Sequence, residues 1–436
     1  MSVYNLISFA GLFVLAGVAW LFSSDRKVVN WRVIGWGIGL QLLVALFIFV
    51  LPAGTRVFLW VNNAVAAVLD TATAGPKFVF GRLALPPGAV NEAGETSLGY
   101  FLAFQGLPTI IFFAALLGAL YYLKIMPFFV RLFARIFTKL MRISGAEALS
   151  VSANIFVGVE SALVIRPHLK DMTRSELGTI ITAGMGTIAS TVLAMYVMML
   201  QKGIPTIAGH LVSASFISAP ACIVMAKLIM PETGKPLTLG LDVQPHYERE
   251  DNVIMAVING AWEGLKLLGG ILTLLIAFLG ILALINLALG WGGGLVNGLF
   301  GWHLKWSLEA FLGYIFYPFS LIIGVPPSDA LTIARILGER TILTEVFSYR
   351  HLADLLAAGA LHDPRSAIIA SYALCGFAHV ASLAIFVGGT SALVPTRVRD
   401  ISRLGFRALL AATLACLMTG AVAGTFYTGA SVLFGK

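Results

Sequence analysis

Three short stretches of the sequence place polar or ionisable side chains in otherwise apolar surroundings. The first, SVSANIFVGVESALVIRP, contains Asn154, Glu160 and Ser161, and Gly158 precedes the acid. A glycine permits a break in a helix. Such a break frees backbone carbonyls that can bind a cation, and a nearby carboxylate can accept hydrogen bonds from hydroxyl groups. The pattern favours an ion or solute site, and the alternative is a buried ion pair between Glu160 and Arg166.

The second stretch, RTILTEVFSYRHL, places Glu345 between apolar residues, where a carboxylate could bind hydroxyl groups. The alternative is an interfacial segment with Glu345 facing water, because Glu339, Arg340 and Arg350 lie nearby.

The third stretch, YALCGFAHVASLAIFVGG, carries His379 and Ser382 three residues apart, on one face of a helix. Thr191, in GTIASTVLAMY, is a similar isolated hydroxyl. Such groups can contact a solute, but membrane helices use them mainly in packing. Metalloprotease, nucleophile-elbow and Walker motifs are missing from the sequence, which argues against an enzyme or an ATP-driven pump.

The composition predicts an all-α polytopic membrane protein. Of the 436 residues, 58% are hydrophobic and 11% are charged, whereas soluble domains carry about 25% charged residues. The net charge of +8 fits Lys and Arg retained on the cytoplasmic side and not a nucleic-acid partner. Because no basic residue precedes the first apolar run and no A-x-A site follows it, we expect a spanning helix there and not a cleaved signal peptide. Cys222, Cys375 and Cys416 lie in apolar runs, and we interpret them as buried thiols and not as a disulfide framework.

Apolar runs long enough to span a bilayer recur along the chain. They lie near 3–23, 32–53, 100–123, 177–200, 207–230, 267–290 and 405–432, and runs broken by Gly, Pro or polar residues lie near 146–170, 308–338 and 366–394. Broken runs at membrane depth are typical of re-entrant hairpins or discontinuous helices, where transporters form solute and ion sites.

The distribution of Lys and Arg predicts a topology. The basic segments 24–32 and 124–145 face the cytoplasm, and the mixed 54–97 connection faces outside. Basic residues on one face and Phe and Leu on the other predict an interfacial amphipathic helix over 126–143. We expect a loop over 231–250, a second interfacial helix over 251–266 and a turn-rich break at 359–366.

The sequence resembles the concentrative nucleoside transporter family. The matching strings include ALSVSANIFVG, IRPHLKDMTRSEL, LGYIFYPFSLIIGVP, TEVFSY and PRSAIIASYALCGFA, and the resemblance runs from about residue 98 to 430. It implies about eight transmembrane helices and two re-entrant hairpins in inverted repeats, in a homotrimer whose transport part moves like an elevator. The hairpins would be 146–170 and a segment within 308–338.

We accordingly divide the chain into five parts. They are 1–97 (N-terminal helices and external connection), 98–145 (third helix and basic interfacial helix), 146–230 (first hairpin and following helices), 231–307 (loop, interfacial helix and scaffold helix) and 308–436 (second hairpin and C-terminal helices).

The resemblance also implies roles for individual residues. For sodium, these are the Asn154 side chain, the Val157 carbonyl, Thr191 and the Val192 carbonyl, with Thr191 standing where some members have Ser. For the solute, Glu160, with its neighbours Val159 and Ser161, faces a nucleobase, while Glu345, His379 and Ser382 face a ribose.

Two departures from the family pattern affect the solute site. Only Val159 separates Gly158 from Glu160, where the family commonly has two residues, and His379 replaces an Asn. The sequence therefore predicts a sodium-coupled nucleoside symporter of the cytoplasmic membrane, with no cofactor besides its coupling ion. The alternatives are a proton-coupled carrier of another hydroxylated solute and a receptor or channel derived from the same fold.

Overall fold

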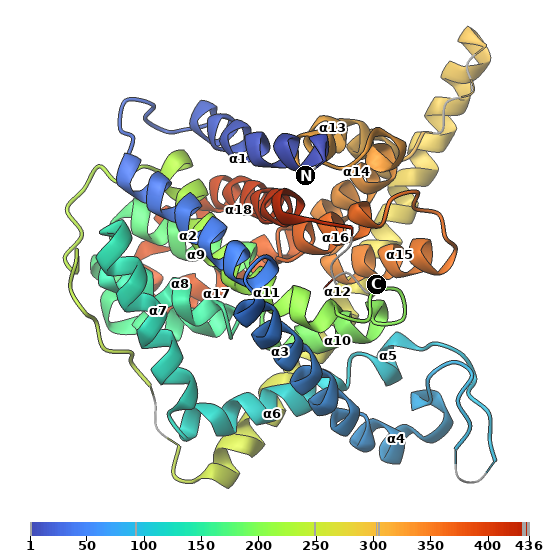
Figure 1. The fold of residues 1–436 in the computed structure, drawn as a ribbon, viewed down its shortest axis with the longest axis horizontal. Coiled ribbons are helices and arrows are strands. Elements are labelled where there is room, and N and C mark those ends of the chain that lie inside the picture. Colours follow the sequence, from blue (N-terminus) through green and yellow to red (C-terminus); the bar gives the residue numbers. More distant parts are fainter. Residues whose placement is uncertain are drawn as a thin grey trace.

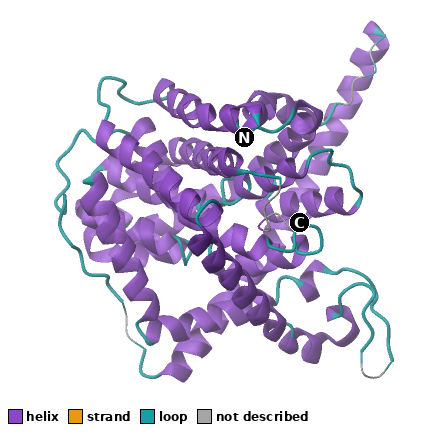
Figure 2. Cartoon of the chain, viewed as in Figure 1, coloured by secondary structure: helices purple, strands orange, loops and turns teal. Residues whose placement is uncertain are grey.

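The computed structural model describes residues 2–91, 94–247, 250–301, 303, 306–429 and 433. Within these ranges helices and their connections make up the chain, and the only extended pairings are isolated bridges (Figure 2). The first half contains α1 (Val3–Leu21), α2 (Trp31–Phe49), α3 (Pro52–Ala72), α4 (Ala74–Phe80), η1 (Gly81–Ala84), α5 (Leu102–Gln105), α6 (Thr109–Tyr122), α7 (Ile125–Met141), α8 (Gly145–Asn154), η2 (Val159–Asp171), α9 (Arg174–Gly186), α10 (Ser190–Leu200) and α11 (Ile207–Ile229). The second half contains α12 (Val253–Phe300), α13 (Leu308–Ile322), α14 (Pro327–Ile342), α15 (Glu345–Ala357), α16 (Pro364–Ala373), α17 (Val380–Leu393), η3 (Pro395–Arg397) and α18 (Val398–Phe426).

The protein is an all-α polytopic membrane protein. Among the described residues, eight helical stretches are long and apolar enough to cross a membrane. Helices α11 and α18 lie in the middle of the molecule. In their most apolar 18-residue stretches, 89% and 83% of the residues are buried within the protein, whereas the share for α12 is 11%. The far end of α12 projects beyond the other helices (Figure 1). A water-soluble protein would not leave so much apolar surface uncovered.

Four helical segments are each interrupted in the middle, so that each consists of two short helices. The interruptions follow in the same order in the two halves of the chain. In the first half, α8 and η2 are separated by 155–158, and α9 and α10 by 187–189. In the second half, α14 and α15 are separated by 343–344, and α16 and α17 by 374–379. This repetition is the arrangement expected of inverted repeats with two hairpins.

Polar and thiol contacts hold these interruptions together. The Ser190 amide donates to the Phe156 carbonyl at 3.1 Å, which joins the first two breaks. The Cys416 thiol of α18 lies 3.8 Å from the Gly186 carbonyl and 3.6 Å from the Cys375 carbonyl, which joins the second and fourth. All three cysteines are buried and free, as the sequence predicts.

The structure corrects three expectations. By its place in the repeat, the counterpart of the first hairpin is α14–α15, with its break at Leu343–Thr344, and not a segment within 308–338. Gly324 and the following prolines do form a turn, but this turn packs on α1, where the Ser8 hydroxyl donates to the Ile323 carbonyl at 2.9 Å. The 177–200 run is interrupted at 187–189. The expected interfacial helix over 251–266 is the first part of the 48-residue α12, because its polar residues occupy one face of a continuous helix.

The segment 231–252 connects α11 to α12 without regular structure, as expected of a loop, and it is fastened to the first hairpin. The amide of Gly145 donates to the Thr238 carbonyl and that of His246 to the Val164 carbonyl, both at 2.8 Å. An ion pair of 2.8 Å between Arg135 and Asp242 attaches the same segment to α7. The expected amphipathic helix over 126–143 is α7.

Candidate functional site

One cavity of about 720 Å³ brings together most of the residues predicted to form a site. This volume lies within the usual range for small-molecule sites, about 300–1,000 Å³. Seven of the ten predicted residues line it: Val157, Glu160, Thr191, Val192, Glu345, His379 and Ser382. Residues that are nearly 230 positions apart in the sequence therefore share one space.

The four interruptions explain this convergence. Glu160, Thr191 and Glu345 lie in the first turns of η2, α10 and α15, and His379 is the N-cap of α17. Four helix N-termini therefore meet at the cavity. The positive dipole ends of these helices favour carboxylates and other oxygen-bearing groups there.

The Glu345 carboxylate is buried, at 3% exposure, and other side chains lie close to both of its oxygens. The Tyr196 hydroxyl donates to Oε1 at 2.6 Å. Nε2 of His379 lies 2.9 Å from Oε2. Buried charges persist only where such partners and hydrogen bonds compensate for lost hydration. Glu345 is thus buried within the protein at the cavity wall, whereas the alternative of an interfacial segment would leave its carboxylate facing outside water.

The hydrogen bonds of His379 define its tautomer. Its Nδ1 accepts a bond from the Ser382 amide at 3.1 Å, so this nitrogen carries no proton. The ring is then neutral and offers its proton from Nε2, toward Glu345. The Ser382 hydroxyl contacts the carbonyls of Phe377 and His379. His379 and Ser382 therefore present one donor and one hydroxyl beside the carboxylate.

The other half of the site contains a buried oxygen without a partner. Asn154 ends α8 with 0% exposure, and its Nδ2 donates to the Ser150 carbonyl at 3.1 Å. Its Oδ1 has no hydrogen-bond partner. A buried carbonyl oxygen left unpaired beside a helix break is a suitable ligand for a hard cation.

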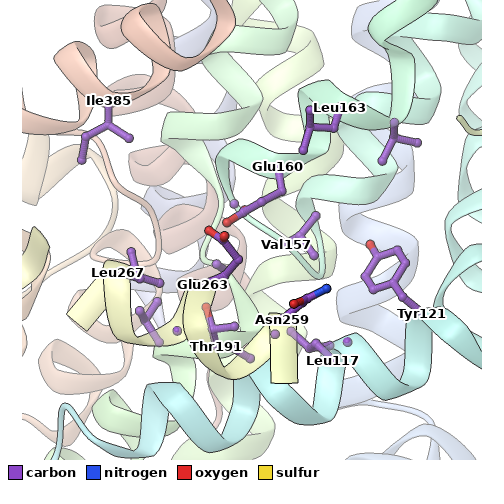
Figure 3. A pocket seen from close by; sticks show the side chains of 18 of the residues that line it. Leu117, Tyr121, Val157, Glu160, Leu163, Thr191, Asn259, Glu263, Leu267 and Ile385 are labelled. Atoms are coloured by element: carbon purple, nitrogen blue, oxygen red, sulfur yellow. The ribbon is translucent and has the colours of Figure 1, made fainter. Parts of the chain in front are cut away.

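A second wall of the cavity comes from α6 and α12, and sequence reasoning missed it. Figure 3 shows the Glu263 carboxylate of α12 pointing toward that of Glu160, with Asn259 and Tyr121 close by. Glu263 also forms an ion pair of 2.6 Å with Lys266. A pattern of polar residues four apart, Asn259 and Glu263, within an apolar helix could have indicated that this face meets a cavity.

The connecting segment 231–252 contributes Tyr247 to the same wall. Burial raises the pKa of Tyr247 to about 12, so its hydroxyl stays protonated at physiological pH. Its ring packs on that of Tyr121, with centroids 5.5 Å apart.

Three predicted residues are not placed on the cavity wall. Asn154 and Ser161, each almost fully buried, lie outside the lining. The side chain of Val159 lies outside the described part of the chain. Arg166 lines the cavity as well as Glu160, so the proposed ion pair between them remains an alternative.

Comparison with known families covers almost the whole chain. A model described as "Na+ dependent nucleoside transporter C-terminus" matches residues 210–424, the corresponding N-terminus model matches 10–83, and a model described as "Nucleoside recognition" matches 103–203. The nucleoside permease NupC of Helicobacter pylori is 37% identical, over 98% of this chain and 99% of its own length. The chain belongs to the concentrative nucleoside transporter family. The relatives of this family that match the chain are described as transporters and permeases.

Relatives of this transporter include longer proteins. Human solute carrier family 28 member 3 is 38% identical over 96% of this chain, but the chain spans about 60% of that protein's length. A structure titled CNTnw in an inward-facing substrate-bound state has a TM-score of 0.85 at 33% identity, covering 97% of this chain and 98% of the other. A variant of the same protein, titled in an outward-facing state, has a TM-score of 0.85 at 32% identity and covers 98% of both chains.

Proposed function

We propose that this transporter is a sodium-coupled symporter that imports nucleosides across the cytoplasmic membrane. The observation that carries the proposal is the pairing of two half-sites in one fold. An unpaired oxygen of Asn154 lies at the first break, and the Glu345 carboxylate with His379 lies at the third and fourth. Family membership and the two half-sites together favour a coupled carrier over a receptor or channel built on the same fold.

Sodium would be held on the first-half side of the cavity. The ligands we assign are the Asn154 side chain, the Val157 and Val192 carbonyls and the Thr191 hydroxyl. They are all neutral oxygens, and hard monovalent cations are bound well by such groups. Bound sodium would supply the free energy of its gradient, and its ligands would fix the break against the start of α10.

The nucleoside would lie between the hairpin breaks. We assign the nucleobase to Val159, Glu160 and Ser161, and the ribose to Glu345, His379 and Ser382. Glu345 would accept a ribose hydroxyl in a charge-assisted hydrogen bond. Nε2 of His379 would donate to the same or the neighbouring hydroxyl, because it lies 2.9 Å from Oε2 of Glu345.

Movement would follow an elevator scheme, in which the two hairpins and their following helices carry the cavity past α6 and α12. The inward-facing and outward-facing structures of a relative support two end states for this fold. The uncovered apolar face of α12 supports a homotrimer built around this helix, with lipid on the remaining surface.

Uptake of labelled uridine into proteoliposomes tests the proposal. An imposed sodium gradient should drive accumulation, and Asn154→Ala should raise the sodium concentration needed for half-maximal uptake by about tenfold or more. Accumulation driven by a proton gradient in the absence of sodium would favour the proton-coupled alternative, for which the close His379–Glu345 contact is the supporting observation. Equilibration without accumulation under either gradient would favour a channel.

A further inference from the structure

The hydroxyl of Tyr196 contacts the Glu345 carboxylate from a position outside the cavity lining. It donates to Oε1 of Glu345 at 2.6 Å. Tyr196 is fully buried and does not line the cavity, so this contact orients Glu345 without occupying solute space. Oε2 remains on the side of His379, where a solute hydroxyl would arrive. The two carboxylate oxygens thus have separate roles.

Tyr196 belongs to the helix that begins at the proposed sodium site. The first turn of α10 carries Thr191 and Val192, and Tyr196 follows Val192 by four residues, on the same helical face. The start of α10 is also tied to the first hairpin, because the Ser190 amide donates to the Phe156 carbonyl. An 11-residue helix is stiff, so a displacement of its first turn is carried to Tyr196.

A second contact links the same two helices. The rings of Tyr196 and Tyr349 stack with centroids 4.5 Å apart and an interplanar angle of 25°. Tyr349 lies on α15, four residues after Glu345, and its hydroxyl donates to the Ser371 carbonyl of α16 at 2.8 Å. Tyr196 of the first half therefore contacts the second hairpin through a ring stack and through one hydrogen bond to the Glu345 carboxylate.

We propose that Tyr196 is a positioning residue that couples the sodium half of the site to the solute half. Sodium at the start of α10 fixes this helix, and the Tyr196 hydroxyl then holds Glu345 in the rotamer that receives a solute hydroxyl. Without sodium, α10 is free to shift, and the carboxylate loses its fixed orientation. The inference rests on the proposed sodium-coupled function and names the residue that carries the coupling.

Coupling of this kind is reciprocal and measurable. If sodium tightens solute binding by some factor, the solute tightens sodium binding by the same factor, typically about 5–150-fold. The test measures the Kd of uridine for purified protein by titration calorimetry, in sodium chloride and in choline chloride. The ratio of the two Kd values is the coupling factor.

The informative variant is Tyr196→Phe, which keeps the ring stack and removes the hydroxyl. We expect its coupling factor to fall at least about fivefold, mainly because uridine binds more weakly in sodium, while the Kd in choline changes little. Tyr349→Phe is the matched control, since it removes a hydroxyl from the same ring pair but not from Glu345, and it should keep the wild-type factor. Tyr196→Leu removes the hydroxyl independently and should show the same loss.

The outcomes separate the inference from the function on which it rests. A wild-type factor of one would overturn both sodium coupling and the role of Tyr196. A wild-type factor well above one that persists in Tyr196→Phe or in a folded Tyr196→Leu would overturn the role of Tyr196 alone. An equal loss in Tyr349→Phe would assign the effect to general packing and would also overturn it.

Discussion

At the scale of single residues, the central feature is a carboxylate that is oriented by neighbouring side chains in a buried site. Tyr196 and His379 lie against its two oxygens, at 2.6 and 2.9 Å. The position of Glu345 at the start of α15 adds a favourable helix dipole. Three different helices thus stabilise one charge.

Replacing this charge tests its role. Glu345→Gln keeps the shape but weakens charge-assisted hydrogen bonds to hydroxyl groups, each worth about 1.5–3 kcal/mol. We expect uridine uptake to fall at least about tenfold while the variant elutes like the wild-type protein in size-exclusion chromatography. Asp354→Asn, which alters a carboxylate on the exposed face of the same helix, is the control and should transport normally. Full uptake by Glu345→Gln would exclude the proposed ribose contact.

Residue types in the sequence were enough to single out Glu160, Glu345, His379 and Ser382, because polar groups in apolar runs are costly and conspicuous. Glu263 was missed because its charge does not stand isolated in an apolar run. Its neighbour Lys266 made the segment resemble an interfacial helix, and the partner it faces, Glu160, is about a hundred residues away in the sequence. Only the packing of α12 against the cavity reveals that approach.

At the scale of elements, the break between α16 and α17 packs closely against the end of α9. Gly376 lies at the break between α16 and α17 with φ of +159°. A Cβ there would lie 3.0 Å from the Gly186 backbone and 2.6 Å from the Cys416 sulfur. Since backbone atoms cannot rotate away as a side chain can, the two broken helices approach this closely only with glycine at this position.

A methyl group should therefore force the breaks apart. We expect Gly376→Ala to reduce uridine uptake by about tenfold or more and to lower the melting temperature, because overpacking typically costs about 1–3 kcal/mol. Gly388→Ala, in α17, meets nothing within 4 Å and serves as the control. If Gly376→Ala matched the control in uptake and melting temperature, the close approach of the two helix breaks would not be required.

The breaks differ in how visible they are in the sequence. Gly158 and Gly376 accompany the first and fourth breaks, so glycine content indicated both regions. The third break, Leu343–Thr344, contains neither glycine nor proline. The resemblance placed this hairpin within 308–338, where Gly324 and Pro326 form a turn in another part of the fold. Tertiary packing, and not local propensity, ends α14.

At the scale of the whole molecule, Arg365 joins the ends of the chain to its interior. Its guanidinium, 2% exposed, donates to the Gly324, Tyr4 and Gly424 carbonyls at 2.7–2.9 Å. It also donates to the Ser8 hydroxyl at 2.8 Å. One side chain on α16 therefore fastens α1, the turn before α14 and α18.

Removing this side chain should destabilise the whole assembly of helices. Arg365→Ala would leave several buried carbonyls without donors, and we expect a loss of about 3 kcal/mol or more, seen as a lower melting temperature in detergent. Arg174→Ala removes a largely exposed arginine and should change stability by less than about 1 kcal/mol. Equal melting curves for the two variants would contradict the fastening role.

The connecting segment 231–252 would also limit how far the first hairpin could travel in the proposed elevator scheme. The segment is bonded to α8 at Thr238 and to η2 at His246, beyond its ion pair with α7 at Asp242, so in the proposed scheme its end at His246 would move with the hairpin. Only residues 247–252 then separate it from the start of α12 at Val253. Six residues at full extension reach about 20 Å. In the proposed elevator scheme this short covalent tether would bound the travel of the hairpin, and lengthening it would be a direct way to ask whether the tether or the packing stops the motion.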